Sequence, residues 1–199
     1  MQTIPPLDVI LFDPLSWMHP RRLPLAPPLS GCGPRSIIND MVIAAQCWST
    51  QRPEVPEHGL AAHFIRHWHA LPQVALLMAC QRHRALLSRQ GRLRLLPGWA
   101  RQFAELAIVE SSAGPAVPVI MPDTLLAWGK SELLACGPWL PLAIQQRIPL
   151  LFSPDMDRSD GAAPAAPPSP LLIKLACQYA KRNPAIPDAA EFRRSFNQA

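Results

Sequence analysis

The sequence predicts an all-α, mainly helical fold: an irregular single domain of short helices delimited by prolines, with at most marginal strand content. Apolar residues recur every three or four positions along most segments, which is the spacing of one helix face. The chain contains 25 prolines among 199 residues, well above the usual proportion of roughly 5%. Because proline interrupts the interior of a helix, the helices are expected to be short, and a regular bundle of long helices is not expected.

The first helix is predicted within the block FDPLSWMHPRRL at residues 12–23. Asp13 followed by Pro14 predicts a helix start, since a carboxylate caps free amide groups and proline fits the first helical position. Pro20 is expected to end this helix. Trp17 and its apolar neighbours give the helix more apolar surface than so short an exposed element would carry. We therefore expect the helix to dock on the core.

The remaining elements follow from the same periodicity and from proline, glycine and aspartate boundaries. Residues before Phe12 form an extended lead-in, in which Asp8–Phe12 is a candidate short strand. Asp123 is a predicted N-cap, Gly91 a predicted C-terminal stop, and Ser169 with Pro170 a predicted start of the last helix. One face of the helix expected at Ser36–Ser49 carries Ile37, Met41, Ala44, Ala45 and Trp48 at helical spacing, and we expect this face to lie against the core. The expected helices span Ser36–Ser49, Glu57–Ala70, Pro72–Gln90, a segment that begins at Pro97, Asp123–Gly137, Pro138–Arg147 and Leu171–Lys181.

Three parts are expected along the chain. Residues 1–154 form the helical core with its proline-rich N-terminal lead-in. Residues 155–170 are rich in proline and alanine, a composition typical of a flexible linker. Residues 171–199 contain a C-terminal helix that packs back on the core. A loop is expected at residues 111–122, and a weak helix in the tail at residues 183–199.

The composition favours a cytoplasmic protein with covered surfaces. Charged residues make up 17% of the chain, below the roughly 25% of an average domain, which suggests faces that partners cover. The N-terminus lacks the pattern of a signal peptide, and no apolar run reaches the roughly 18 residues that a membrane-spanning helix needs. The five cysteines are widely spread and form no CxxC pair, as expected of reduced thiols in the cytosol.

Three histidines form the one candidate metal site. His63 and His67 are four residues apart, so on a helix they would share a face and could bind one metal ion. His69 would point elsewhere. No acidic residue lies between Glu57 and Glu105 to orient the ligands, and metal-binding histidines normally have such a partner. A metal-dependent enzyme built on His63 and His67 is therefore an alternative hypothesis, and a solvated or partner-facing histidine row is preferred.

No motif of catalysis or cofactor binding is present. The sequence contains neither a GxSxG nucleophile elbow nor a glycine-rich phosphate loop. We therefore expect no catalytic residue, no cofactor and no metal, and we expect that the protein is not an enzyme.

The strongest electrostatic feature is a basic segment. Residues 58–104 contain seven arginines and no acidic residue. Such a segment could meet an acidic protein surface, nucleic acid or anionic lipid, or could simply form the solvated faces of amphipathic helices. Its aromatic residues fall at core spacing, so nucleic acid is not expected as a partner, although a nucleic-acid or membrane-surface binder remains an alternative. Arg82, Arg84 and Arg89 are the candidate contact with an acidic protein partner.

A second candidate partner surface lies at the corner that Pro20 creates. Trp17, His19, Arg21 and Arg22 are close in sequence there, and tryptophan and arginine are enriched at the energetic centres of protein interfaces. The remaining tryptophans mostly fit helix core faces.

Several blocks resemble one known family. FDPLSWMHPRRL, LPQVALLMAC at Leu71–Cys80, RIPLLF at Arg147–Phe152 and LACQYAKRNP at Leu175–Pro184 occur in the order found in the OrgA/MxiK/SctK family of bacterial type III secretion systems. Trp17 stands where that family more often has tyrosine.

This resemblance implies a non-enzymatic cytoplasmic adaptor that is needed for protein secretion and virulence. Such an adaptor belongs to the sorting platform at the cytoplasmic face of the inner membrane. It would link the inner-membrane ring protein (SctD type) to the pod protein (SctQ type), near the stator and ATPase components, with membrane contact only through its partners. The resemblance brings no catalytic residue with it.

Overall fold

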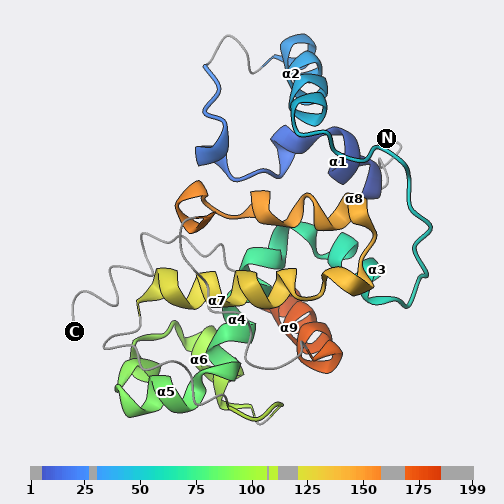
Figure 1. Ribbon diagram of the computed structural model, residues 1–199. Coiled ribbons are helices and arrows are strands. Elements are labelled where there is room, and N and C mark those ends of the chain that lie inside the picture. Colours follow the sequence, from blue (N-terminus) through green and yellow to red (C-terminus); the bar gives the residue numbers. More distant parts are fainter. Residues whose placement is uncertain (1–5, 27–30, 107, 112–120, 158–168, 185–199) are drawn as a thin grey trace. The chain divides into compact units, whose positions relative to one another are not determined.

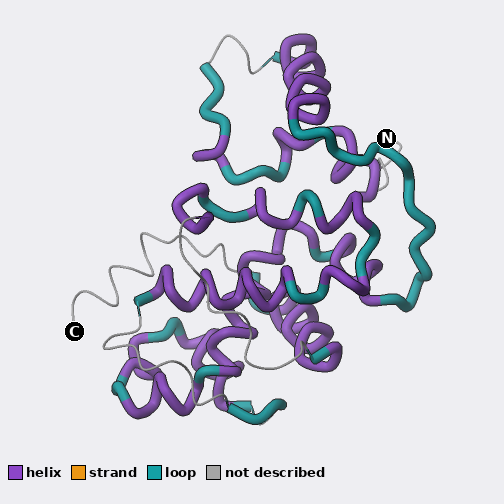
Figure 2. Tube along the Cα trace, viewed as in Figure 1, coloured by secondary structure: helices purple, strands orange, loops and turns teal. Residues whose placement is uncertain are grey.

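A computed structural model describes residues 6–26, 31–106, 108–111, 121–157 and 169–184. Over these residues the chain forms α-helices and short 3-10 turns but no strand (Figure 2), which confirms the all-α prediction. The chain divides into two compact units, each assembled from segments that are distant in sequence. One unit comprises Met1–His69 and Gly137–Arg158, and the other Ala70–Cys136 and Ser159–Ala199.

The α-helices of each unit are labelled in Figure 1, and the 3-10 turns between them are not. The first unit contains α1 (Pro6–Phe12), η1 (Pro14–Ser16), η2 (Pro20–Arg22), α2 (Cys32–Ala45), α3 (Leu60–Arg66), η6 (Gly137–Trp139), α8 (Leu142–Gln145), η7 (Ile148–Leu151) and η8 (Pro154–Asp157). The second contains α4 (Leu71–Arg82), α5 (Arg84–Arg89), η5 (Arg92–Leu95), α6 (Gly98–Glu105), α7 (Pro122–Leu134) and α9 (Pro170–Arg182). The turn η4 (Trp68–Ala70) spans the boundary. No described helix is long and apolar enough to cross a membrane.

Helix α4 is the centre of the second unit. It packs against α6, α7 and α9, and all of its residues except Pro72 are buried. Val74 and Leu77 on one side of the helix are fully buried, and the opposite sides of the helix are buried too. A helix covered on several sides needs no polar face, and this explains the continuous apolar sequence of α4.

The crossing of α4 and α7 depends on a glycine. A Cβ atom added to Gly129 of α7 would overlap the backbone carbonyl of Ala75 in α4. Small residues at a helix crossing let two backbones approach closely. Gly129 therefore sets the distance between the two helices that make the largest contact in this unit.

The predicted helix Pro72–Gln90 is interrupted at His83. Helix α4 ends at Arg82 and α5 begins at Arg84. The backbone of His83 leaves helical geometry, at φ −102° and ψ 18°. The end of α5 agrees with the prediction, because Gly91 has a left-handed backbone with φ +67°, a conformation that glycine adopts without strain.

Helix α9 confirms its predicted start. The side chain of Ser169 accepts a hydrogen bond from the amide of Leu172, with Pro170 at the first helical position, as a capped helix requires. Leu172 and Ala176 are fully buried where the helix packs on α4. The remaining N-cap prediction in this unit is wrong: Met121, without a side-chain cap, precedes α7, and Asp123 lies in its first turn.

Three tryptophans pack together within the core of the first unit. The ring of Trp17 meets the ring of Trp68 edge-on at 5.3 Å and lies 6.4 Å from that of Trp48. Its indole Nε1 donates a hydrogen bond to the carbonyl of Val9 at 3.2 Å. All three side chains are buried, so the predicted docking of Trp17 is confirmed.

A buried arginine completes that core. Arg147, next to α8, is fully buried and its guanidinium lies 5.0 Å from the centre of the Trp48 ring. It donates hydrogen bonds to the carbonyls of Leu11, Ser49 and Ala143. Burial lowers the pKa of Arg147 to about 10. The side chain therefore remains charged at neutral pH and ties three segments of the unit together through their backbone oxygens.

The N-terminal segment differs from its prediction. Residues Pro6–Phe12 form α1, so neither the extended lead-in nor the strand at Asp8–Phe12 is present there. The predicted helix after Asp13 is a single 3-10 turn, and Asp13 makes no side-chain cap. Its carboxylate is instead bound by Arg35 and Asn39 of α2, and a carboxylate with these long-range partners is not free to cap its own helix.

Several predictions fall on residues outside the described ranges. They concern most of the loop at 111–122, the linker at residues 158–168 and the tail helix from residue 185 onward. The ends of the predicted linker are described and are helical. Pro154–Asp157 form η8 with Met156 buried, and Pro170 already belongs to α9.

Candidate functional site

The corner at Pro20, with Trp17, His19, Arg21 and Arg22, was predicted as a recognition surface, and the structure shows that most of these side chains bind within the first unit. Trp17 is buried, with 5% of its surface exposed. The Arg22 guanidinium donates to the carbonyls of Phe152 and Pro149, at 2.7 and 2.9 Å. Asp157 pairs with the same guanidinium at 2.8 Å. Trp17 and Arg22 therefore hold the unit together and offer little surface to a partner.

His19 and Arg21 lie at the edge of the same corner. The backbone amide of His19 donates to the carbonyl of Leu150 at 2.9 Å, and its ring Nδ1 accepts from the amide of Arg21 at 3.2 Å. Burial, helped by Arg21 and Arg22, lowers the pKa of His19. Arg21 pairs with Asp155 at 2.5 Å, both side chains being more than half exposed. Among the predicted residues of this corner, Arg21 is the most accessible to a partner.

The basic segment does not form a continuous exposed face. Arg82 is buried in the second unit, and its Nε lies 3.3 Å from the carboxylate of Glu132 in α7. Arg84 is half-buried and donates to the side chain of Gln81 and to the carbonyl of Val109. The sequence could not reveal this, because Glu132 lies far outside the acid-free stretch. Replacing Arg82 by glutamate would place two carboxylates together in the interior, so it is unsuitable as a surface test.

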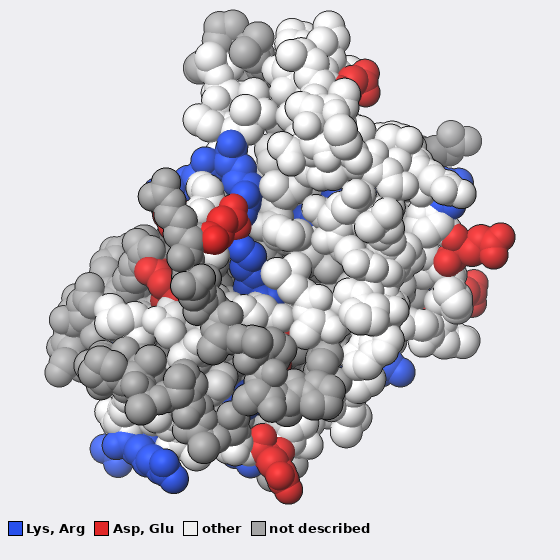
Figure 3. All heavy atoms as spheres, viewed as in Figure 1, with Lys and Arg blue, Asp and Glu red and all other residues white. Residues whose placement is uncertain are grey.

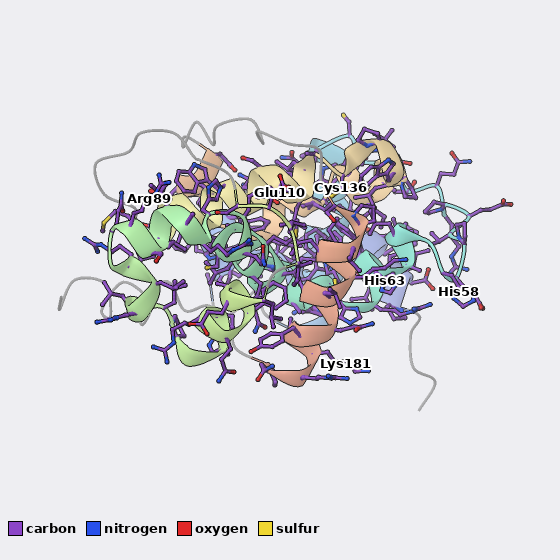
Figure 4. The ribbon with its side chains drawn as sticks, turned by 90° about the horizontal axis from the view of Figure 1, so that it is seen from below. His58, His63, Arg89, Glu110, Cys136 and Lys181 are labelled. Atoms are coloured by element: carbon purple, nitrogen blue, oxygen red, sulfur yellow. The ribbon has the colours of Figure 1, made fainter. Side chains whose placement is uncertain are left out.

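Arg89 is the exposed member of the predicted arginine contact. It lies in the last turn of α5 on the outer side of that helix (Figure 4). The face of the molecule in Figure 3 carries few charges overall, and most of its described atoms are uncharged. This agrees with the low charge of the sequence.

The histidines of the candidate metal site are close but differ in exposure. His63 in α3 (Figure 4) and His67 just after it have ring centres 6.4 Å apart. The ring Nδ1 of His67 lies 3.2 Å from the carbonyl of His63. His69 is exposed. Across the described ranges, no group of three or more histidine, cysteine, aspartate or glutamate side chains is placed to hold a metal ion.

The second unit contains a buried polar group that the sequence did not predict. At the break between α4 and α5, the ring of His83 lies 4.3 Å from that of Trp128 in α7. Its Nδ1 is buried without a hydrogen-bond partner. Burial and the adjacent Arg82 lower the pKa of His83 to about 4. Burial also raises the pKa of Glu132, although Arg82 opposes this.

These shifts predict how stability depends on pH. His83 has a pKa of 6.5 when exposed and about 4 when folded, so between these values the unfolded chain binds a proton that the folded chain excludes. The free energy of unfolding should therefore fall as the pH falls through this window, by up to ~3 kcal/mol. Glu132 acts in the opposite direction, since its raised pKa makes the folded chain keep a proton that the unfolded chain has lost.

A substitution separates the two contributions. The free energy of unfolding, measured in urea between pH 4 and 7, should depend on pH with different slopes in the wild type and in His83→Gln. Glu132 titrates in both proteins, so the difference between the two slopes reports His83. The wild type should lose stability relative to the variant as the pH falls below 6.5. Parallel curves, offset by a constant amount for the lost contact with Trp128, would show that His83 does not titrate in this way.

The sequence also misassigned one helix face. Ile37 and Met41 of α2 were predicted to face the core, but 63% and 64% of their surfaces are exposed. Among the side chains of α2 that the structure describes, Asn39 and Ile43 are buried. Apolar spacing alone does not tell which side of a helix is covered, and here it indicated the open side.

Over the described residues the protein is all-α. Its buried Arg82 and Arg147 each bind groups of their own unit. Over residues 7–182 the chain matches the family described as bacterial type III secretion apparatus protein (OrgA_MxiK). The chain therefore belongs to this family, which confirms the resemblance drawn from its sequence blocks.

Two relatives illustrate the relationship. The oxygen-regulated invasion protein OrgA of Salmonella typhimurium (strain LT2) is 35% identical over 181 residues, which cover 88% of this chain and 86% of that protein. The uncharacterized protein YgeO of Escherichia coli (strain K12) is 29% identical over 126 residues, which cover 62% of this chain and 87% of that protein. No solved structure matches the chain.

Proposed function

We propose that this chain is a non-enzymatic cytoplasmic adaptor of a type III secretion apparatus. It links the cytoplasmic domain of an inner-membrane ring protein (SctD type) to a pod protein (SctQ type), close to the stator and ATPase components, and it is needed for secretion. The observation that carries this proposal is membership of a family of apparatus proteins across residues 7–182. That match includes the described elements of both units.

The division of the chain into two compact units also supports an adaptor role. An adaptor must present at least two surfaces, and a chain of two compact units can give each surface its own core. Large apolar side chains are exposed on both units, for example Ile37 and Met41 on the first and Leu171 on the second. Exposed apolar side chains of this size are common at protein interfaces.

The decisive experiment reconstitutes the link from purified proteins. The full chain should bind the pod protein and the ring protein's cytoplasmic domain separately, and the three should elute together from a size-exclusion column. The pod and ring proteins should elute apart when the chain is left out. The adaptor proposal is wrong if the chain binds neither protein. It is also wrong if the chain cannot bind both proteins at the same time.

Arg89 provides a test of the predicted basic contact. Arg89→Glu should fold normally, because the side chain is exposed, and should slow association with one partner several-fold at low salt, with a smaller effect at high salt. Arg101→Glu is the matched control, since Arg101 is an exposed arginine on α6 of the same unit. If both variants bind as the wild type does, Arg89 is a solvated side chain that contacts neither partner.

A further inference from the structure

Helix α2 is amphipathic, but its polar side faces inward. The buried side chain of Asn39 donates to the carboxylate of Asp13 at 2.7 Å and accepts from the amide of Leu15 at 3.1 Å. Arg35 donates to the same carboxylate at 3.1 Å. This helix contacts α1 and η1. Ile43 is the one buried apolar side chain among those described in the helix, so a network of polar bonds does most to fix it on the first unit.

The outward side of α2 is apolar. Ile37 and Met41 are four residues apart and mostly exposed, and Ala44 and Ala45 continue the same side, also exposed. Figure 1 shows this helix beside α1, and the surface over it in Figure 3 is uncharged apart from acidic atoms at its edge. A helix that turns its apolar side to water gains nothing from burial unless another molecule covers that side.

The charges of α2 indicate what that molecule is. Asp40 is exposed beside Ile37 and Met41, and it takes part in none of the ion pairs of the described residues. The one basic residue of the helix, Arg35, is bound to Asp13 on the inner side. The outer side thus carries a single negative charge at the edge of an apolar stripe, and it complements an apolar stripe flanked by a positive charge.

We propose that the outer side of α2, formed by Ile37, Asp40, Met41, Ala44 and Ala45, is the docking site for an amphipathic helix of a partner protein. A lysine or arginine of that helix would lie at Asp40. The 14 residues of α2 extend over about 21 Å, enough for several turns of such a helix, and the small side chains at the C-terminal end allow close approach. This inference deepens the adaptor function proposed above and rests on it.

Two other occupants fit less well. A second copy of the chain, related by two-fold symmetry, would place the same stripe against itself and bring the two Asp40 carboxylates close together. An anionic membrane is bound by helices with lysine and arginine along their polar flanks. The exposed side of α2 carries a carboxylate instead, which anionic lipid would repel.

The test uses the full chain with purified pod protein and purified ring cytoplasmic domain as separate probes. Ile37→Gln/Met41→Gln should keep the circular dichroism and melting temperature of the wild type, since both side chains are exposed. Its affinity for one of the two probes should fall at least tenfold, and its affinity for the other should not change.

Asp40→Lys should weaken binding of the same probe, more strongly at low salt. Leu142→Gln is the matched control, because Leu142 is equally exposed on the same unit, and should bind as the wild type does.

The other outcomes overturn the docking site in distinguishable ways. If Ile37→Gln/Met41→Gln binds both probes as tightly as the wild type, the docking site is wrong and the adaptor function stands. If the double variant instead loses self-association in sedimentation, or loses binding to phosphatidylglycerol vesicles, the occupant is a second copy or a membrane. If the wild type binds neither probe, the adaptor function fails, and the docking site fails with it.

Discussion

Gly129→Ala should lower the free energy of unfolding by about 3 kcal/mol, the upper part of the range for overpacked cores. The added methyl group would overlap the carbonyl of Ala75 in the neighbouring helix. Backbone atoms cannot rotate out of the way as a side chain can. The helices α4 and α7 would therefore have to move apart and loosen their contact. Urea unfolding followed by circular dichroism measures the change.

Gly33→Ala is the matched control for this substitution. Gly33 also lies within a helix, α2, and a Cβ atom there would have no neighbour within 4 Å. Alanine has the higher helix propensity, so this variant should be unchanged or more stable, by up to roughly 1 kcal/mol. Similar losses of stability in both variants would mean that the crossing of α4 and α7 does not depend on Gly129.

Trp17→Ala should destabilise the protein by roughly 3–5 kcal/mol, the usual effect of removing a large buried aromatic side chain. The substitution leaves a cavity between Trp48 and Trp68 and removes the hydrogen bond to the carbonyl of Val9. Thermal melting and urea unfolding should both show the loss. Binding of partners should fall only under conditions in which the variant unfolds.

Trp139→Ala separates this effect from the loss of any tryptophan. Trp139 belongs to the same unit, but 46% of its surface is exposed, so its removal should change stability by about 0.5 kcal/mol or less. A Trp17→Ala protein that is as stable as the Trp139→Ala protein would show that the three-tryptophan core is not formed. Lost binding in a stable Trp17→Ala protein would restore Trp17 as a recognition residue.

Local rules predicted some elements well. Ser169 and Pro170 predicted the start of α9, and Gly91 predicted the end of α5, because capping and left-handed glycine depend on neighbouring residues alone. At Asp13 such a local rule gave a wrong prediction. Its sequence context predicted an N-cap, but Arg35 and Asn39 bind its carboxylate from α2, and no local rule anticipates partners so distant in sequence.

The candidate binding residues were harder to predict for the same reason. Arg82 was placed on a basic face because no acidic residue is near it in sequence, yet its partner is Glu132 on another helix. Ile37 and Met41 were placed in the core because they follow helical spacing, yet they face outward. Burial is a property of the assembled elements, and one helix does not specify it.

The sequence by itself determined the helical class of the chain, many helix boundaries and the family to which it belongs, since these depend on composition, periodicity and ordered blocks of residues. Only the tertiary structure decided which side of each helix is covered and which charges are paired. It showed that α4 is buried on several sides, that Arg147 holds the first unit through backbone carbonyls, and that α2 turns its apolar side outward. These features arise from contacts between residues far apart in sequence. Such contacts contribute to the stability of the protein only once the elements have packed together.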